Sequence, residues 1–341
     1  MIRVYDFDYN LLCETDKVFS SEWELKFNGI GTYEGSFPIN SEMASVFAGN
    51  RHLVLCEEDR QAICVGKLIS GKVQVYGRTP EWLLSKRIVL PFKTSEIFGS
   101  EYTDPETVLL YLLDSAYKTP SLIDSDGNVS SGINEAAVAE DFVIPEAIGT
   151  DSFDRHFWRN GANELSEVVA DLCDIMGCGH SLIFVPEERC WKFSLVFGEE
   201  KKLLISKSLK NAYDMSMKDS LLDSAEGGYF EIYTSEDEDN LYGYKRTDNA
   251  EGTGMLYWDS VLSSASGLSE AEQLLREKSG EVRLECELMG IEYGTDYKLG
   301  DTLRVQFEAG PFRRTLKRRV TGVSIISSSK GNSVKPTFSE L

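Results

Sequence analysis

Histidine and cysteine side chains are the residues of this chain best suited to metal binding or nucleophilic chemistry. The histidines, His52, His156 and His180, do not fall at the spacing of the H-E-x-x-H pattern of zinc hydrolases. In the stretch CDIMGCGH, Cys173 and Cys178 lie close to His180, and thiolates and imidazoles are ligands that zinc prefers. The spacing is not that of a C-x-x-C pair, and no second pair supplies the remaining ligands. We therefore expect no metal here, but buried thiols beside a turn that ends a helix.

A second candidate is the stretch DSDGN at residues 124–128, which resembles the start of a calcium-binding loop. Glu135 falls at the twelfth position of such a loop, but Gly127 falls at the fourth position instead of the sixth. A flexible turn is the better interpretation. The acidic stretch SEDED at residues 235–239 is interpreted in a similar way, as a run of charged side chains in solvent in preference to an ion site.

Nucleophilic catalysis finds little support in the sequence. There is no G-x-S-x-G nucleophile elbow and no glycine-rich phosphate loop. A Cys–His dyad through His180 stays open, because such partners meet only in the fold. A pair of carboxylates is weak evidence for a catalytic site in a chain with 56 aspartates and glutamates. The sequence therefore favours a protein that is not an enzyme and holds no cofactor or metal.

Charge and composition narrow the class of protein further. The net charge of −21 argues against a nonspecific nucleic-acid binder, which needs clustered lysine and arginine. The charge either keeps the protein soluble or forms an acidic surface that DNA passes without sticking, and composition alone favours the first. The seven cysteines are an odd number and indicate reduced thiols, and neither a signal peptide nor a membrane-spanning apolar run is visible. We expect a folded protein made inside a cell, with no insertion into a membrane.

The elements that must position these residues fall into three parts, of which the first is residues 1–95. Apolar and polar side chains alternate there in short runs, with strands expected at 52–56, 61–69 and 72–76. Strands this short at this spacing are typical of a small barrel or sandwich. The stretch VYGRTPEWLLSKRIVLPF then predicts a strand that runs into one helical turn, since Pro80 is tolerated in a first turn.

Residues 96–205 are predicted to form an α/β unit. Asp104 is the expected N-cap of a helix with a wide apolar face, and a second helix is expected at 163–176. Strands are expected at 181–185 and 190–197, and a long polar surface loop at 121–141.

Residues 206–341 are predicted to return to strands. A hairpin is expected around the SEDED tip, and a helix at 269–279 begins with the capping pattern of Ser269 and Glu272. The stretches EVRLECELMG, DTLRVQFEAG and LKRRVTGVSII each alternate as strands do.

The stretch LGDTLRV carries a local folding signal. Gly300 is expected to take a positive φ and Asp301 to cap the turn through its side chain. Leu303 and Val305 are expected to face inward from the strand that follows.

Three stretches resemble a family of long-tailed phage tail proteins, which is related to the baseplate hub of contractile-tailed phages and to the N-terminal hub of tail-associated lysins. They are IRVYDFDYNLLCE followed by EWELKFNGIGTYEGSFPIN, with a G-x-[YF]-E turn at 31–34; VYGRTPEWLLSKRIV; and YGTDYKLGDTLRVQF, followed by VTGVSII and PTFSE. None is a catalytic motif, and their order over nearly the whole chain carries the resemblance. Many relatives continue into a peptidoglycan-cutting domain, whereas this sequence stops at Leu341, so the resemblance gives no reason to expect lytic activity.

The resemblance implies a β-rich α+β fold like that of a phage tail hub. Two small tube-type β-barrel domains, drawn from residues 1–95 and 206–341, would flank the α/β domain at 96–205. Hub proteins of this family form trimers in which two barrels per subunit make a ring of sixfold-like symmetry. A homotrimer is therefore expected.

The stretch after the first barrel supplies the expected contact residues between subunits or domains. They form an apolar group and a basic group, and they are Arg78, Trp82, Leu83, Leu84, Lys86 and Arg87. The basic side chains would pair with an acidic surface of the partner. The alternative, that Trp82 and the leucines are core of their own domain, stays open.

The function implied by the resemblance is that of a structural hub of a phage or prophage tail, which joins the tail tube to the tip and lets DNA pass without specific binding. Its partners would be further copies of itself, the tube or distal tail protein, and tip or fibre proteins. It would reside in the virion tail after synthesis in the bacterial cytoplasm, with acidic side chains on the inner face of its ring.

Two alternatives remain open. One is a tail-associated cell-wall hydrolase or endopeptidase, for which the sequence offers no converging cluster of catalytic residues. The other is a carbohydrate- or receptor-binding tip module. Its stacking platforms would come from the tryptophans, Trp23, Trp82, Trp158, Trp191 and Trp258.

Overall fold

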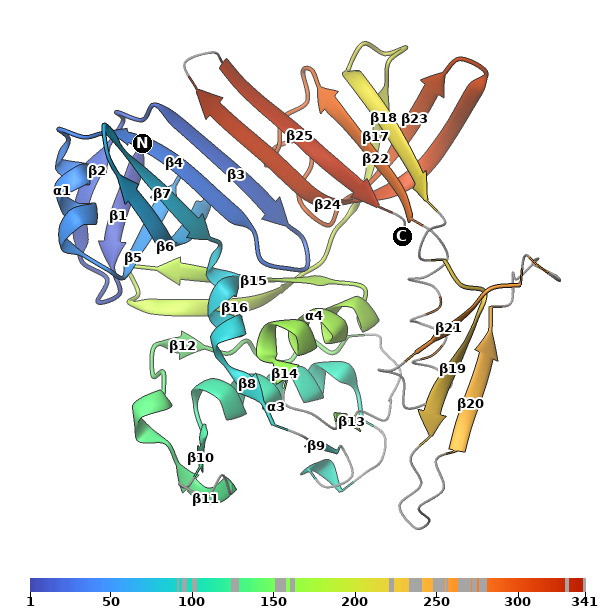
Figure 1. Cartoon of the computed structure of the whole chain (residues 1–341), viewed down its shortest axis with the longest axis horizontal. Coiled ribbons are helices and arrows are strands. Elements are labelled where there is room, and N and C mark those ends of the chain that lie inside the picture. The colour runs from blue at the N-terminus through green and yellow to red at the C-terminus, as the bar shows by residue number, and fades with distance from the viewer. Residues whose placement is uncertain are drawn as a thin grey trace.

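The computed structural model of the chain is built mainly of β-strands with short helices between them (Figure 1). It describes residues 1–90, 92–93, 97–99, 103–123, 129–150, 158–159, 163–220, 224–232, 241–247, 255, 257–262, 271, 275, 281–328 and 331–339. The calcium-loop candidate at 124–128 and the SEDED stretch lie outside the described residues.

Thirteen strands form one continuous sheet that takes in both ends of the chain. Its main path runs β18-β22-β25-β24-β3-β4-β7-β6-β5-β1-β2, and β17 joins through β23, which pairs with β24. The N-terminal strands are β1 (Ile2–Asp6), β2 (Leu11–Thr15), β3 (Ser20–Lys26), β4 (Thr32–Pro38), β5 (Leu53–Glu57), β6 (Arg60–Ile69) and β7 (Lys72–Arg78). The C-terminal strands are β17 (Glu200–Ser206), β18 (Ala212–Ser220), β22 (Glu281–Leu288), β23 (Thr302–Ala309), β24 (Phe312–Ser328) and β25 (Gly331–Ser339).

The N-terminal strands curl around a buried aromatic core. Residues on β3 and β4 alternate between the two faces, so Trp23 and Tyr33 both point inward, with their ring centroids 4.4 Å apart. The Trp23 indole N–H and the Ser21 hydroxyl donate to the Glu57 carboxylate at 2.5 and 2.7 Å, which ties β3 to β5 across the curl. The helix α1 (Glu42–Gly49), which the sequence analysis does not predict, packs against the same core.

The turn before β23 has the predicted geometry. Gly300 has a φ of +88°, and the Asp301 carboxylate accepts a hydrogen bond from the Lys298 N–H at 2.9 Å. Leu303 and Val305 follow and are fully buried. The predicted positive φ, the cap and the two inward side chains are thus confirmed.

The strand β24 joins the two ends of the chain into one sheet. Its first part pairs with β23, and its second part pairs with β25 on one side and with β3 on the other. The N- and C-terminal strands therefore share one hydrophobic core. The β-rich fold is confirmed, but the described strands do not close into two barrels, since their path is open at β2 and at β18. Alternation shows which side of a strand faces a core and not which strand lies along its edge, which is why the sequence did not predict this joining.

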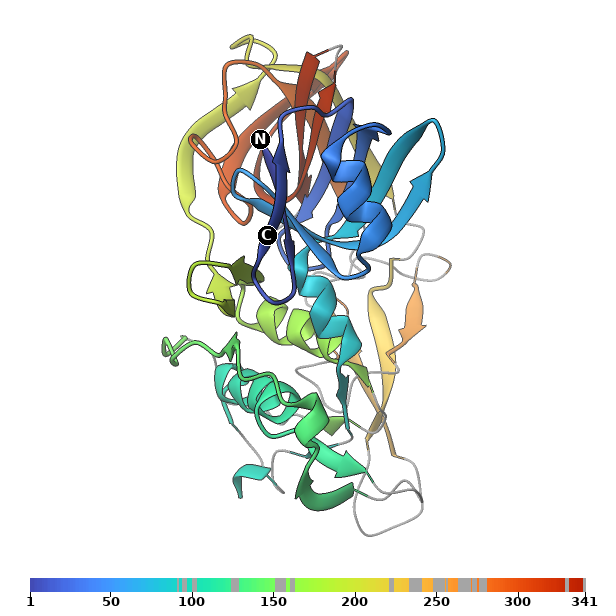
Figure 2. The same ribbon diagram turned by 90° about the vertical axis from the view of Figure 1, so that its left-hand side faces the viewer.

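The middle of the chain forms a unit beneath the large sheet (Figure 2), and its core also takes in Tyr5, Val54 and Ile63 of that sheet. It contains α3 (Pro105–Tyr117), α4 (Leu165–Ile175) and a sheet in the order β12-β16-β15. The strands of this sheet are β12 (Phe142–Val143), β15 (Gly179–Val185) and β16 (Cys190–Val196). The predicted helix starts where expected, because the Asp104 carboxylate accepts the Thr107 N–H at 2.8 Å.

Several short elements complete the middle unit. The loop predicted at 121–141 instead contains a hairpin of β10 (Ser121–Ile123) and β11 (Val129–Ile133), since such short strands carry too little alternation to stand out in a polar segment. The other short elements are η1 (Pro80–Lys86), β8 (Ile88–Val89), β9 (Phe92–Lys93), η2 (Glu135–Ala137), β13 (Trp158–Arg159) and β14 (Asn163–Glu164), of which η1 and η2 are 3₁₀ helices.

A small lobe projects from the C-terminal part of the chain. Its sheet has the order β20-β19-β21, formed by β19 (Gly227–Ile232), β20 (Leu241–Arg246) and β21 (Asp259–Val261). Of the helix predicted at 269–279, the structure describes Ala271 and Leu275, which are helical and buried in the core of this lobe.

Candidate functional site

The 3₁₀ helix η1 carries the apolar contact residues predicted from the sequence. Pro80 begins the turn, as expected of a proline in a first helical position. Leu84 is fully buried, and Trp82 and Leu83 pack partly buried against the same core, which is that of the middle unit. These side chains lie where η1, leaving the large sheet, meets the middle unit of the same chain. We call this meeting point, formed by residues 80–87, the η1 joint.

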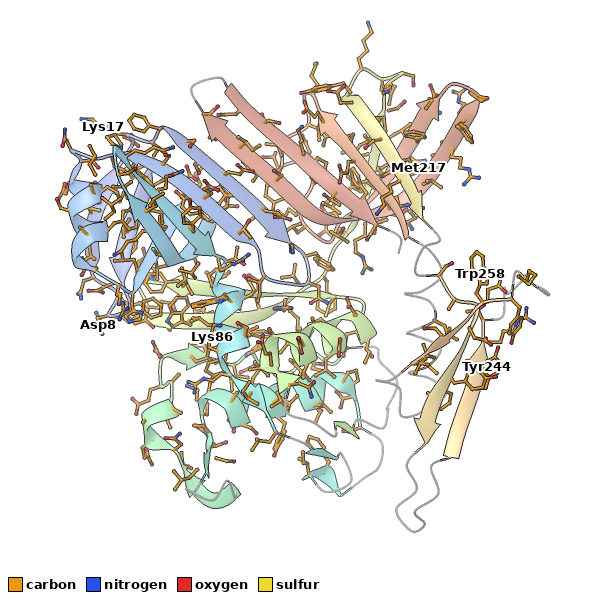
Figure 3. The ribbon with its side chains drawn as sticks, viewed as in Figure 1. Asp8, Lys17, Lys86, Met217, Tyr244 and Trp258 are labelled. Atoms are coloured by element: carbon orange, nitrogen blue, oxygen red, sulfur yellow. The ribbon has the colours of Figure 1, made fainter. Side chains whose placement is uncertain are left out.

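The basic residues of the predicted set divide between two places. Lys86 is labelled in Figure 3, and its ammonium lies 4.6 Å from the ring centroid of Trp82. The Arg87 guanidinium lies 5.0 Å from the ring centroid of Tyr117. Arg87 also donates to a backbone carbonyl of the middle unit at 2.7 Å. Arg78, by contrast, is exposed at the end of β7 and lines the concave face described below.

Two further polar residues, Glu81 of the η1 joint and Gln61 of β6, were not singled out by the sequence. The buried Glu81 carboxylate accepts the Leu182 N–H at 3.0 Å, and burial raises the pKa of Glu81. Gln61 binds both backbone groups of Phe184, donating to its carbonyl at 2.8 Å and accepting its N–H at 2.7 Å. Because β15 pairs with β16 along one edge, these side chains satisfy backbone groups along its other edge. Their partners lie 101 and 123 residues away along the chain, so no local pattern marks them.

The face of the large sheet turned away from its core is concave and polar. Residues of eight neighbouring strands, from β18 to β6 along the sheet, line a cavity of about 480 Å³ on this face. On β3 the exposed Glu22 and Glu24 flank the buried Trp23, so one strand presents carboxylates to the cavity and an indole to the core. We call this surface the concave face.

Acidic side chains predominate on the concave face. Six carboxylates and two cations line the cavity: Glu22, Glu24, Glu34, Asp214, Glu285, Glu287, Arg78 and Lys335. Glu22 lies directly opposite Glu34 on the neighbouring strand, and both are exposed. Like charges in that relation destabilise a sheet. The pairing therefore weakens the fold, which points to a role for the charge itself.

Two strand edges border the concave face. β6 pairs with β5 only as far as Ile63, so among the described residues Cys64 and residues 66–69 pair with β7 alone, and Val65 lies in a bulge between them. At the opposite end, β18 pairs with β22 alone among the described strands. Both edges carry exposed apolar side chains, which are Val65, Leu68 and Ile69 on β6 and Tyr213 on β18. An unpaired edge of this kind is a template for pairing with another chain.

The Cys173, Cys178 and His180 group is buried inside the middle unit. Gly177, with a φ of +68°, follows α4, and the Cys178 N–H donates to the Cys173 carbonyl at 2.9 Å. The predicted buried thiols and helix-ending turn are thus confirmed. His180 Nδ1 is hydrogen-bonded to Asn28 Oδ1 at 2.8 Å, and burial lowers the pKa of His180 to about 4. Within the described ranges, no three His, Cys, Asp or Glu side chains gather as a metal site.

Comparison with solved structures finds the same arrangement of elements in phage tail proteins. The prophage tail protein gp18 of Listeria monocytogenes superposes with a TM-score of 0.59 over 100% of this chain and 94% of its own, at 11% sequence identity. The chain has the fold of a prophage tail protein. The tail protein of Neisseria meningitidis superposes with a TM-score of 0.58, covering 99% of this chain and 96% of its own at 10% identity. The 43 kDa tail protein of prophage MuSo2 from Shewanella oneidensis gives 0.55, covering 99% and 97% at 9% identity.

These likenesses confirm, at the level of the fold, the resemblance to phage tail proteins predicted from the sequence. No protein-family model and no curated protein matches the chain. Of these comparisons, it is the one with solved structures that recognises the tail-protein fold. In the part of the chain that the structure describes, no helix is long and apolar enough to cross a membrane.

Proposed function

We propose that the protein is a structural hub of a phage or prophage tail, in which three copies close into a ring around the path of the DNA. It joins the tail tube to the tip, catalyses no reaction, and resides in the virion tail after synthesis in the bacterial cytoplasm. Its neighbours are the tube or distal tail protein on one side and tip or fibre proteins on the other. The fold shared with prophage tail proteins supports this class of function.

The concave face is the observation that carries the proposal. Eight strands about 4.8 Å apart span an arc of roughly 38 Å, so three copies close a circle about 37 Å across. Two copies would close a circle only about 24 Å across, which inward side chains would narrow too far for a DNA duplex. The number of strands therefore favours three copies over two.

The strand edges bordering the concave face supply the contact between copies. Residues 64–69 of β6 and the outer edge of β18 stand at opposite ends of the arc. Pairing of β6 in one copy with β18 in the next continues the sheet around the ring. Such a contact joins two different surfaces of identical chains. It closes into a ring when a whole number of copies, each rotated by the same angle from the last, completes a full turn.

The acidity of the concave face suits a channel through which DNA moves. Carboxylates repel phosphates, so a wall dominated by glutamates passes DNA without holding it in a fixed contact. The like-charge pair of Glu22 and Glu34 has a function in this setting, because it keeps the wall acidic where packing alone would favour neutral side chains.

The division of the chain follows the same proposal. The N-terminal strands β1 to β7 and the C-terminal strands β17, β18 and β22 to β25 belong to the ring, and the middle unit is held against it by the η1 joint. Of the predicted contact residues, Trp82, Leu83, Leu84, Lys86 and Arg87 serve this joint, whereas Arg78 faces the channel.

Substitutions at the two edges test the ring. Leu68→Asp on β6 and Tyr213→Asp on β18 should each prevent assembly, because a carboxylate held in the seam would be buried without a partner. Light scattering on the wild-type chain should give three times the 38.2 kDa of one chain, and each variant should give a single chain.

Leu209→Asp is the matched control, since Leu209 is exposed to a similar extent but lies in the turn after β17, outside both edges. This variant should assemble like the wild type. A control that fails to assemble, or a wild-type chain that stays a monomer or dimer at every concentration, contradicts the ring.

A further inference from the structure

The lobe of β19, β20 and β21 presents an unusual group of exposed aromatic side chains (Figure 3). Tyr229 lies opposite Tyr244 on β20 and opposite Val261 on β21, so all three share one face of the sheet. Tyr229 is 49% exposed and Val261 is 76% exposed. Trp258, next to β21, is also exposed, whereas Trp23 and Trp191 are buried in the cores of other parts of the chain. Of the tryptophans considered as stacking platforms, Trp258 is thus one that the fold leaves accessible.

Polar groups are built into the same face. Gly227 lies opposite both Arg246 and Asp259, which places these side chains beside the tyrosines. The Tyr244 hydroxyl donates to Asp259 Oδ1 at 2.9 Å and is hydrogen-bonded to the Tyr257 hydroxyl. The Arg246 guanidinium lies 4.8 Å from the ring centroid of Tyr257. These contacts hold the rings in fixed orientations before any ligand arrives.

A glycine forms the floor of this face. A Cβ atom at Gly227 would lie 2.1 Å from the Tyr244 hydroxyl and 2.6 Å from Asp259 Oδ1. Any larger residue would therefore push the hydroxyl and the carboxylate apart. We define Tyr229, Tyr244, Tyr257, Arg246, Asp259 and Val261 around Gly227 as the lobe patch.

We propose that the lobe patch binds an oligosaccharide. Sugar rings present C–H groups on one face, which suit the negative face of an aromatic ring, and hydroxyl groups at their edges, which suit a carboxylate and a guanidinium. The lobe patch has both kinds of partner within one short sheet. Tyrosine also offers rigid contact area at a low cost in conformational entropy.

The size of the lobe patch favours a saccharide over a protein partner. Three strands of at most six residues make a face of roughly 300 Å², whereas a stable protein interface takes about 800 Å² from each partner. A few sugar rings cover such an area. An exposed apolar patch with polar groups among its rings marks an interaction surface.

Titration of the full-length chain with defined sugars tests this site. The probes are chitohexaose, cellohexaose and maltohexaose, and binding is measured by calorimetry, with saturation transfer from protein to sugar C–H protons as a second readout. At least one probe should bind saturably, with transfer strongest to the sugar face that stacks. Tyr229→Ala and Tyr244→Ala should each weaken binding about tenfold or more, as loss of one stacking ring does.

Three further variants make the test decisive. Tyr111→Ala removes a tyrosine that is 39% exposed on α3, far from the lobe in the sequence, and should leave binding unchanged. Asp259→Asn should weaken binding without loss of the fold, as judged by circular dichroism. Tyr244→Phe keeps the ring and removes its hydroxyl, so it should bind more weakly than the wild type and more tightly than Tyr244→Ala.

Clear outcomes would overturn the saccharide site. They are the absence of saturable binding for all three probes at millimolar concentration, equal loss in Tyr111→Ala, and a lobe variant that changes self-association instead of sugar binding. The lobe patch shares no residue with the concave face or its edges. Failure of the saccharide proposal therefore does not affect the proposal of a ring, and failure of the ring proposal does not affect the saccharide proposal.

Discussion

Gly300 and Asp301 show how single residues set the path of the chain into β23. A Cβ at Gly300 would lie 2.2 Å from the Phe27 ring, so glycine is needed for space as well as for its φ of +88°. The Asp301 carboxylate accepts the N–H groups of Lys298 and Glu199 at 2.9 and 2.8 Å, which fixes the starts of β23 and β17 together. Both residues were predictable because a positive φ and a turn acceptor are local requirements.

We expect Gly300→Ala to destabilise the fold more than Gly290→Ala. Both glycines have positive φ, at +88° and +68°, so each substitution carries a backbone cost of about 1–2 kcal/mol. Only at Gly300 does the new methyl group also meet a ring, since the space around Gly290 is open. Denaturant unfolding of both variants measures the difference, and equal losses would contradict this account of the turn.

His180 should make stability depend on pH. Its pKa falls from 6.5 to about 4 because burial disfavours the charged imidazolium, so the folded state prefers the neutral ring. This contribution is fully present above pH 6.5 and is lost as the pH falls towards 4, by on the order of 3 kcal/mol. Chemical unfolding of the wild type and of His180→Gln over this range isolates the histidine from the carboxylates. Parallel pH profiles for the two proteins would show that His180 does not titrate as described.

Residues whose partners are distant in the chain escaped prediction. The buried Glu106 carboxylate accepts the backbone N–H groups of residues 148–150, which lie 42 to 44 positions away. In the sequence it is one acidic residue in the first turn of a helix, as the helix dipole favours. By contrast, the N-cap Asp104 bonds three residues ahead, at Thr107, and was predictable.

At the scale of elements, the short runs were harder to assign than the long ones. For residues 1–95 the sequence predicted strands followed by one helical turn near Pro80, and this prediction missed α1. Its signals are present, since Ser41 accepts the Ala44 N–H as an N-cap and the buried Met43 and Phe47 recur four residues apart. Eight helical residues between strands give a weak period, and the alternation on either side conceals it.

The outer edge of β15 offers a direct test of the contact between the middle unit and the sheet. We expect Gln61→Ala to destabilise the fold by about 1–3 kcal/mol, because two backbone groups of Phe184 lose their partner. Hydrogen exchange of the Phe184 amide should accelerate. The Ile183 amide, which points to the β16 side of the same strand, should keep its protection and is the internal control. Unchanged exchange at Phe184 would contradict the role given to Gln61.

For the whole molecule, strand order was beyond the reach of the sequence. The alternating patterns identified the strands and their buried faces, but they could not show that β24 continues past β23 to pair with β3. This pairing turns two expected barrels into one sheet with a concave face. The acidic composition was visible from the start, whereas its concentration on that face depends on the register that sets Glu22 opposite Glu34.

The most direct test of the account is the structure of the assembled particle by cryo-electron microscopy. We predict a threefold ring in which β6 of each copy pairs with β18 of the next, and in which Glu22, Glu24 and Glu34 line the channel. A particle with the concave face turned outward, or a channel wall dominated by lysine and arginine, would contradict the proposal.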